Sequence, residues 1–399
     1  MVVRGTRFRF DYFYKDIQMK LSYAKKLIQQ LLIQAHIEIN GKNPRDIQVH
    51  NEKLYLRVLK NPILALGESY MGGWWDCENL DEFFFYLLRT ELPENIKRNK
   101  YFLYYFIKEK LRMLMMSCFN LQAKSRAFEV GEHHYDKGNS LYQAMLDKDL
   151  TYSCAYWKKS KILDEAQQAK LALVCEKLNL KSGMKILDIG CGWGSFARYA
   201  AENYGVSVLG LTVSKKQFHY AKKICEGWPV EILFKDYRDI NGVFDRICSI
   251  GMFEHVGPKN HKAYMKIVHR CLKNSGLFLL HTIGSNTSKY HPNPWIHKYI
   301  FPNGILPSIR QIGKASEGLF IMEDWHNFGA YYDRTLMAWF ENFNKSWISL
   351  KKDYDYGSFY RMWKYYLLAC AGAFRARDLQ LWQIVFSKDG LINGYESIR

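Results

Sequence analysis

The sequence lacks several features that would assign the protein to other classes. Its nine cysteines are scattered through 399 residues without a C-x-x-C pair, so we expect reduced thiols and no metal centre. No apolar run is long enough to span a bilayer, and charges interrupt the N-terminal stretch where a signal peptide would have its apolar core. Internal repeats and low-complexity segments are also missing. These absences favour a cytoplasmic protein.

Acidic residues are few in comparison with basic residues. The chain has 39 Asp and Glu against 57 Lys and Arg, and its formal net charge is +18. Such a charge suits an anionic partner, either nucleic acid or the headgroups of a membrane. Aromatic residues often stand beside basic ones, as in RFRFDYFYK and KRNKYFLYYFIKEK. This mixture is typical of surfaces that lie between an apolar and a charged phase.

Residues 1–113 are predicted to form a small α+β domain that engages lipid. Apolar positions recur at helical spacing over residues 21–36, and residues 37–40 read as a short strand. A basic and aromatic stretch with a helical pattern follows at about residues 91–124, either as a connection or as a surface that contacts a membrane. We place a helical linker at residues 114–137.

A glycine pair marks a turn inside the N-terminal domain. It precedes Trp74 and Trp75, and Asp81 is placed to cap the apolar helix that follows. The two tryptophans are interpreted either as core residues of this turn or as a lipid-facing aromatic site.

Residues 138–399 are predicted to form a catalytic domain with a parallel, doubly wound sheet. Five buried strands alternate with helical patterns, which is typical of α/β folds. The strands are KILDIG, SVLGLTV, EILFKD, RICSIGM and GLFLLHTI. Further along come FIMEDWHNF, a helix around LMAWFENF, a long helix ending in ACAGAFRARD, and a last strand, LQLWQIVFS.

A glycine-rich turn follows the first of these strands. Asp188 is followed by Gly190, Gly192 and Gly194, whereas a dinucleotide-phosphate loop would read G-x-G-x-x-G. A carboxylate before the turn repels phosphate but suits a cationic methionine group. The turn resembles the first motif of class I S-adenosylmethionine methyltransferases.

Two polar residues after the next strand are candidates for contacts with ribose. Thr212 and Gln217 carry neutral hydrogen-bonding groups. The alternative is that Ser214 caps a helix and that Gln217 is solvated.

Longer strings extend the resemblance from about residue 31 to residue 386. They are GESYMGGWWDC, HYDKGNSLY, YSCAYW, LDIGCGWG, LTVSKKQ, GMFEHVG, LLHTIGS, NPWIHKYIFPNG, EDWHNFGAYYDRTLMAW and CAGAFRARDLQLWQ. Together they resemble the cyclopropane-fatty-acyl-phospholipid synthases, with the mycolic acid methyltransferases as more distant relatives. The resemblance implies an α/β class I methyltransferase fold with a mostly parallel seven-stranded sheet. It also implies that S-adenosylmethionine donates a methylene group to a cis double bond of a phospholipid acyl chain, forming a cyclopropane fatty acid.

The reaction makes physical demands that can be compared with the residues. An alkene is a weak nucleophile, so the sulfonium methyl must be held beside it in a dry pocket. Attack leaves a carbocation, which aromatic faces can stabilise. The candidate rings are Tyr152, Trp157, Tyr332 and Trp339, although each could simply be core.

Ring closure requires a base that removes a proton from the transferred methyl. The resemblance implies that bound bicarbonate is this base. The residues that would hold it are Cys154, Glu254, His281, Ile283 and Tyr332. Glu254 and His281 follow or end buried strands, where α/β sheets bind ligands.

Three other candidates are weaker. Cys370 lies in a family string and is included as a tentative catalytic residue, although the chemistry needs no covalent intermediate and a packing role is the alternative. His133 and His134 are interpreted as structural, because neighbours in sequence cannot both face one ion on a regular element. Tyr135 and Asn139 are placed near the cofactor.

Cofactor-binding residues are carried over from the same resemblance. They are Tyr152, Ser153, Asp188, Gly190, Cys191, Gly192, Trp193, Gly194, Thr212, Gln217, Tyr237 and Arg238. Tyr237 and Arg238 stand where the mycolic relatives have Trp-Glu.

The expected partners are a bilayer of anionic, unsaturated phospholipid and a second copy of the chain in a homodimer, with the enzyme on the inner face of the cell membrane. One alternative is a lipid methyltransferase that leaves a methyl branch without closing the ring. A nucleic-acid methyltransferase is disfavoured, because GMFEHVG stands where an N-P-P-Y-type motif would be. A lipid-binding protein without enzymatic activity would need neither the glycine turn nor Glu254.

Overall fold

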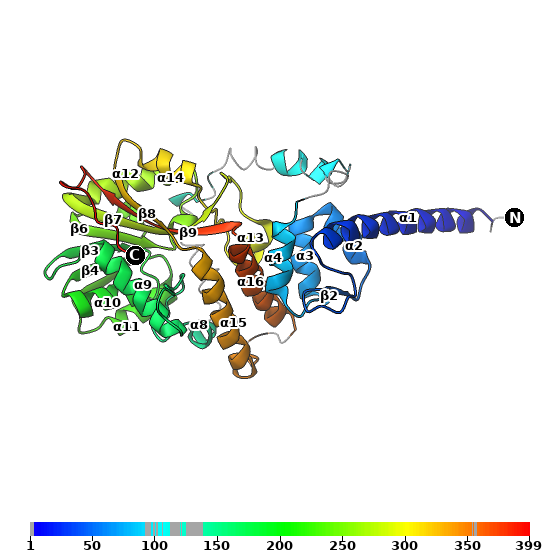
Figure 1. Cartoon of the computed structure of the whole chain (residues 1–399), viewed down its shortest axis with the longest axis horizontal. Coiled ribbons are helices and arrows are strands. Elements are labelled where there is room, and N and C mark those ends of the chain that lie inside the picture. The colour runs from blue at the N-terminus through cyan, green and yellow to red at the C-terminus, as the bar shows by residue number, and fades with distance from the viewer. Residues whose placement is uncertain are drawn as a thin grey trace. The chain divides into compact units, whose positions relative to one another are not determined.

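The chain forms two compact units (Figure 1). The computed structural model describes residues 4–91, 97–98, 100, 103–105, 107–111, 120, 122–124, 139–352, 354 and 357–399. The first unit contains Met1–Met115 and Tyr354–Ala376, and the second contains Met116–Asp353 and Arg377–Arg399. Within the described ranges, no helix is both long and apolar enough to cross a membrane.

The first unit is mainly helical, with one small antiparallel sheet. Its helices are α1 (Arg4–Gln34), α2 (Lys53–Lys60), α3 (Pro62–Met71), α4 (Leu80–Arg89) and α16 (Ser358–Arg375), and its strands are β1 (Gln48–Val49) and β2 (Trp75–Asp76). Residues 37–40 do not form the expected strand, since only Ile39 makes an isolated bridge, to Ile47. The backbone of Asn40 has a positive φ of 56°, which extended structure does not allow.

Helix α16 belongs to the first unit, whereas the sequence analysis included its residues in the catalytic domain. It packs against α3 and α4, and Gly372 allows the close approach: a Cβ at this position would lie 2.5 Å from the carbonyl oxygen of Asp81. Asp81 is not the helix cap, because α4 begins at Leu80 after Asn79. Its carboxylate instead pairs with Arg375 of α16 at 2.7 Å.

The two adjacent tryptophans have different environments. Trp75 is fully buried and its Nε1 donates to the carbonyl oxygen of Leu66 at 3.1 Å, so for Trp75 the core interpretation is confirmed. Trp74 is half-buried, with the guanidinium of Arg57 5.2 Å from its ring centroid.

A seven-stranded sheet forms the centre of the second unit, as predicted. The strands are β3 (Lys185–Ile189), β4 (Ser207–Thr212), β5 (Val230–Phe234), β6 (Phe244–Ile250), β7 (Leu272–Ser285), β8 (Ile321–Asn327) and β9 (Leu379–Ser387). Their order is β5-β4-β3-β6-β7-β9-β8; β9 pairs antiparallel with β7 and β8, and the other neighbouring strands pair in parallel. Strands β4 and β5 lie on one side of β3, and strands β6 and β7 lie on the other. The strand order therefore reverses beside β3, and doubly wound sheets bind ligands at such a switch point.

Helices cover both faces of this sheet (Figure 1). The described helices of the second unit are α8 (Asn139–Met145), α9 (Leu163–Lys177), α10 (Ser195–Tyr204), α11 (Lys215–Ile224), α12 (His261–Cys271), α13 (Pro294–Tyr299), α14 (Ile309–Ser316) and α15 (Ala330–Leu350), with short 3₁₀ turns η2 (Tyr237–Asp239) and η3 (Phe253–His255). Apolar residues of α9, α10 and α11 form the core on one face, and those of α12 and α14 form it on the other. The continuous apolar strands are therefore buried on both sides, as a parallel sheet requires.

Candidate active site

The glycine turn has the backbone that its spacing predicts. Gly190, Gly192 and Gly194 have positive φ angles of 87°, 57° and 91°, a region that residues with a Cβ rarely adopt. A Cβ on Gly190 would lie 2.8 Å from the Cβ of Met252, whereas a Cβ on Gly192 would meet no atom within 4 Å. The turn thus leaves open space above Gly192, next to the N-terminus of α10.

A pocket of about 180 Å³ lies at this turn. Of the predicted cofactor residues, those that line it are Tyr152, Ser153, Asp188, Gly190, Cys191, Gly192, Trp193, Thr212, Gln217, Tyr237 and Arg238. Gly194 is outside the lining, and its position is explained by packing, because a Cβ there would lie 3.1 Å from the Cβ of Ala221. Asn139 adjoins the pocket through its Oδ1, which lies 3.4 Å from Nε1 of Trp193. His133, His134 and Tyr135 lie outside the described residues.

Asp188 is an acidic group with one unsatisfied oxygen. The residue is 1% exposed. Its Oδ1 accepts from the thiol of Cys248 at 3.5 Å, and its Oδ2 has no hydrogen-bond partner in the described part of the chain. Burial raises its pKa to about 7, against the lowering effect of Cys248 and Lys170. A cationic ligand in the pocket would satisfy this oxygen and favour the ionised carboxylate.

The side chains of Thr212 and Gln217 meet at the carboxyl end of β4. The hydroxyl of Thr212 donates to Oε1 of Gln217 at 3.0 Å, and both residues are buried in the pocket wall. Ser214 caps α11 by accepting from the backbone N–H of Gln217. The helix cap is therefore present, but Gln217 is not solvated, so a contact between Gln217 and a bound ribose stays a prediction.

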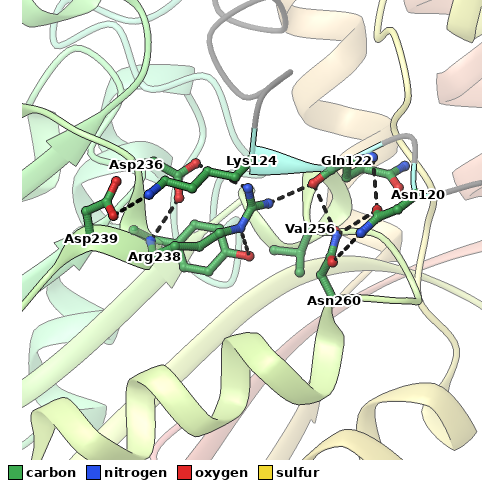
Figure 2. A network of polar contacts seen from close by, with 9 residues as sticks. Asn120, Gln122, Lys124, Asp236, Arg238, Asp239, Val256 and Asn260 are labelled. Atoms are coloured by element: carbon green, nitrogen blue, oxygen red, sulfur yellow. Dashed lines mark hydrogen bonds and ion pairs between the residues drawn. The ribbon is translucent and has the colours of Figure 1, made fainter.

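Arg238 holds a segment of chain against the pocket rim (Figure 2). Its Nη2 donates to the carbonyl oxygen of Gln122 at 2.7 Å, and its guanidinium lies 5.0 Å from the ring centroid of Tyr237. Asn260 also donates to the Gln122 carbonyl, at 3.2 Å, and Lys124 pairs with Asp239 at 2.5 Å. Arg238 thus positions the chain around Gln122, and a direct contact with adenine stays a prediction.

Glu254 lies in η3 and is 6% exposed. Its Oε1 accepts from the backbone N–H of Ile283 at 2.7 Å, and no described residue bonds to its Oε2. Burial raises the pKa of this carboxyl to about 7. Glu254 and Ile283 are therefore brought together directly, with one carboxylate oxygen left for a ligand.

His281 is on the same strand as Ile283, two residues earlier, so the two side chains share a face of β7. Burial, followed by the positive charges of Lys170 and Lys177, lowers its pKa well below the usual value. Its Nδ1 lies 3.3 Å from Nε2 of Gln383. With that amide donating to Nδ1, the proton of the neutral ring lies on Nε2, which has no partner among the described residues.

Cys154 contacts helix α15, which also carries Tyr332. The thiol of Cys154 is fully buried, which raises its pKa. It lies 3.9 Å from the hydroxyl of Thr335, one turn after Tyr332. The ring of Tyr332 is 5.9 Å from that of Trp339, which in turn is 5.2 Å from Tyr152 in the pocket wall. These rings extend from the pocket along α15.

Trp157 and Cys370 have other surroundings. Arg334 lies 4.5 Å over the ring of Trp157, and a ring that already faces a cation is poorly suited to stabilise a second one. Cys370 is on α16 of the first unit, where burial raises its thiol pKa. The five candidates for the bicarbonate site, by contrast, are all in the second unit.

Sequence reasoning missed several pocket residues. Gln122 and Lys170 line the pocket but belong to no string used above, and Asp236 and His255 line it from the strings EILFKD and GMFEHVG without having been assigned a role. Lys170 alone leaves a signal, since it is a lysine on the apolar face of a helix. No group of three or more potential metal ligands is found among the residues that the structure describes.

The sequence is similar to enzymes that modify acyl chains. Residues 122–384 match the mycolic acid cyclopropane synthetase family. The chain is 54% identical over 374 residues to the cyclopropane-fatty-acyl-phospholipid synthase of Escherichia coli K12, covering 94% of this chain and 96% of that protein. It is 35% identical over 264 residues to cyclopropane mycolic acid synthase 3 of Mycobacterium tuberculosis, covering 61% of this chain and 91% of that protein.

Solved structures agree with these sequence matches. The cyclopropane synthase MmaA2 of Mycobacterium tuberculosis superposes with a TM-score of 0.61 at 33% identity, covering 65% of this chain and 98% of that one. The mycolic acid cyclopropane synthase CmaA1, solved with SAH and CTAB, also gives 0.61, at 32% identity and the same coverage. Coclaurine N-methyltransferase shares the fold, with a TM-score of 0.66 at 20% identity over 82% of this chain and 100% of that one. The chain therefore belongs to the mycolic acid cyclopropane synthetase family, on the fold of the class I S-adenosylmethionine methyltransferases.

Proposed function

We propose that this S-adenosylmethionine-dependent enzyme transfers a methylene group to a cis double bond of an unsaturated phospholipid acyl chain and closes a cyclopropane ring. The observation that carries the proposal is the 54% identity over 94% of the chain with a cyclopropane-fatty-acyl-phospholipid synthase. This similarity includes the N-terminal unit, beyond the residues 122–384 that match the family.

The residues around the glycine turn fit S-adenosylmethionine. The cofactor supplies a sulfonium methyl as the transferred carbon. Asp188 has an unsatisfied carboxylate oxygen in the pocket wall, Gly192 leaves the space that a Cβ would fill, and Thr212 and Gln217 offer polar groups at the next strand end. This donor set suits a ligand with a cationic centre and a hydroxylated sugar.

Glu254 and His281 fit a small oxyanion that both accepts and donates hydrogen bonds. Oε2 of Glu254 and Nε2 of His281 are buried and have no partner among the described residues. Bicarbonate, when bound, would supply the base that removes a proton from the transferred methyl. The backbone N–H of Ile283 holds the carboxylate, and burial keeps the imidazole neutral, so it can donate a hydrogen bond without adding charge.

A bilayer partner is supported by charge and by exposed apolar groups. In the described part of residues 103–111, Leu103, Tyr104, Ile107 and Leu111 are each about half or more exposed, from 49% to 67%, and exposed Lys108 and Lys110 lie among them. Apolar and basic groups on one helical stretch suit the interface of an anionic membrane. A homodimer and a place on the inner face of the cell membrane are proposed from the family resemblance.

The proposal is tested with purified enzyme, S-adenosylmethionine and vesicles of unsaturated anionic phospholipid. We expect acyl chains heavier by one methylene unit, which gas chromatography with mass spectrometry identifies as cyclopropane. A methyl-branched product would support the alternative without ring closure. Methylated nucleic acid in place of modified lipid would contradict the proposed substrate.

A further inference from the structure

Lys170 is a buried cation in the wall of the cofactor pocket. It lies on α9, is 1% exposed, and lines the pocket together with Ser153 and Asp188. Its Nζ donates to the hydroxyl of Ser153 at 3.0 Å. An ammonium group has three donor hydrogens, and no second hydrogen-bond partner is found for it among the described residues. Donor capacity therefore remains beside the pocket.

The two carboxylates that raise the pKa of Lys170, Asp147 and Asp188, have other hydrogen-bond partners. Asp147 accepts hydrogen bonds from the backbone and hydroxyl of Thr151, at 2.7 and 3.1 Å, and from the backbone of Asp149 at 3.2 Å. Asp188 bonds to Cys248. Both carboxylates act on Lys170 through charge: burial lowers its pKa to about 8, while Asp147 and, more weakly, Asp188 raise it. Lys170 is therefore mainly protonated at pH 7 although it has no bonded anion.

Lys177 shows the contrast on the same helix. It is one heptad further along α9 and is also fully buried. Its Nζ lies 3.5 Å from Oδ2 of Asp324 and 3.1 Å from Nδ1 of His326, so the protein itself supplies its partners. A buried charge without such partners is costly. An anionic group of a ligand can supply to Lys170 the negative charge that Asp324 supplies to Lys177.

We infer that Lys170 is a cofactor-binding residue that recognises the carboxylate of the methionine moiety of S-adenosylmethionine, with Ser153 as its hydrogen-bonded companion. The inference rests on the proposed cofactor of this site. Asp188 provides the opposite charge in the same pocket wall, so the pocket matches a ligand that carries both a carboxylate and cationic groups. Lys170 thereby selects for the complete amino-acid part of the cofactor.

The test compares two ligands that differ only in the carboxylate. Dissociation constants of S-adenosylmethionine and decarboxylated S-adenosylmethionine are measured by calorimetry for the wild type, Lys170→Met and the matched control Lys177→Met. In Lys170→Met we expect S-adenosylmethionine to bind about 10-fold to 100-fold more weakly, the loss of one charge-assisted hydrogen bond. The affinity for the decarboxylated ligand changes little. Lys177→Met lowers the melting temperature but keeps the wild-type ratio of the two affinities.

Two outcomes would overturn the assignment. One is a wild-type enzyme that binds both ligands equally, and the other is a Lys170→Met variant that keeps the wild-type preference. If Lys170→Met does not fold, Lys170→Gln, which can still donate to Ser153, replaces it with the same expected loss of preference. Binding is measured without turnover, so a wild type that binds S-adenosylmethionine but forms no ring contradicts the proposed function and leaves the Lys170 test intact.

Discussion

Single residues in the second unit combine burial with unsatisfied polar atoms. Asp188, Glu254 and His281 are each at most 6% exposed, and each has one side-chain atom without a partner among the described residues. Burial acts on acids and bases in opposite directions, raising the carboxyl pKa values and lowering that of the imidazole. All three groups are thereby biased toward the neutral state, from which a charged ligand can shift them.

Glu254→Gln should separate catalysis from cofactor binding. The amide oxygen can still accept from Ile283, so we expect an unchanged fold and an almost unchanged S-adenosylmethionine affinity. Turnover should fall about 100-fold or more, the range expected when a general base is lost, because the amide nitrogen replaces the oxygen that is proposed to hold the bicarbonate. Because the pKa of Glu254 is about 7, wild-type turnover should also fall as the pH drops below 7, as measured by product formation across pH. An equal loss of affinity and turnover would mean that Glu254 holds the fold or the cofactor.

His261→Phe should reduce the sensitivity of the protein to acid. His261 is 2% exposed and stacks on Phe253 with ring centroids 4.3 Å apart, and burial lowers its pKa from 6.5 to about 4. Between these values the unfolded chain binds a proton that the folded chain does not, so stability falls as the pH drops below 6.5. The loss amounts to about 3 kcal/mol at most. Urea unfolding at pH 7 and pH 4.5 measures it, and equal losses in wild type and variant would contradict the prediction.

At the scale of elements, the strand-turn-helix unit from β3 to α10 shapes the cofactor pocket. Its three glycines differ in their surroundings: Gly190 faces Met252, Gly192 faces open space, and Gly194 packs on α11. Within this one turn, glycine is required at Gly192 for its backbone conformation alone, and at Gly190 and Gly194 also because neighbouring atoms leave no room for a Cβ.

Gly190→Ala and Gly192→Ala form a matched pair. Both place a Cβ at positive φ, which costs about 1–2 kcal/mol. Only Gly190→Ala also collides with Met252, and such overpacking adds about 1–3 kcal/mol. We expect denaturant unfolding of the cofactor-free protein to show the larger loss for Gly190→Ala. Equal losses would mean that Met252 moves away at little cost.

The sequence predicts regular elements better than it predicts their partners. Strands such as β3 could be predicted because apolar runs such as KILDIG reflect burial on both faces. Helix α16 was also found, but its packing on α4 depends on the close approach at Gly372, which no periodicity reveals. In the pocket, the turn residues carry a motif, whereas Gln122 is brought in by Arg238 through a backbone carbonyl. Every residue has a backbone carbonyl, so the residue type at position 122 does not reveal this contact.

At the scale of the whole molecule, charge and exposed apolar groups together determine how the enzyme would meet a membrane. The net charge of +18 acts over the Debye length, about 10 Å at 0.1 M salt and about 3 Å at 1 M. Apolar contact is not screened in this way.

Binding to anionic vesicles should therefore weaken as salt rises. Sedimentation of enzyme with vesicles, over a series of salt concentrations, measures the effect, and neutral vesicles provide the control. Salt-independent binding would contradict electrostatic docking and would assign the contact to exposed side chains such as Leu103, Tyr104 and Leu111.

The first unit is built from two separate segments of the chain, Met1–Met115 and Tyr354–Ala376, and this gives a prediction about fragments. A fragment of residues 1–115 lacks α16, which packs on α3 and α4 and carries Arg375, the partner of Asp81. We expect this fragment to show weak near-ultraviolet circular dichroism and rapid proteolysis. Joining residues 354–376 to it through a flexible linker should restore both signals. A fragment that is already resistant to proteolysis would contradict the prediction.

The position of α16 in the chain also has a consequence for synthesis. Strand β8 is hydrogen-bonded in the described sheet only to β9, and β9 follows α16 in the chain. On a ribosome, β8 therefore emerges before the strand that attaches it to the sheet, and α16 must be made in between. The first unit is completed by α16 and the sheet by β9, which come within about thirty residues of each other. If translation stops before α16, neither unit has all of its elements. The incomplete chain then contains no complete unit.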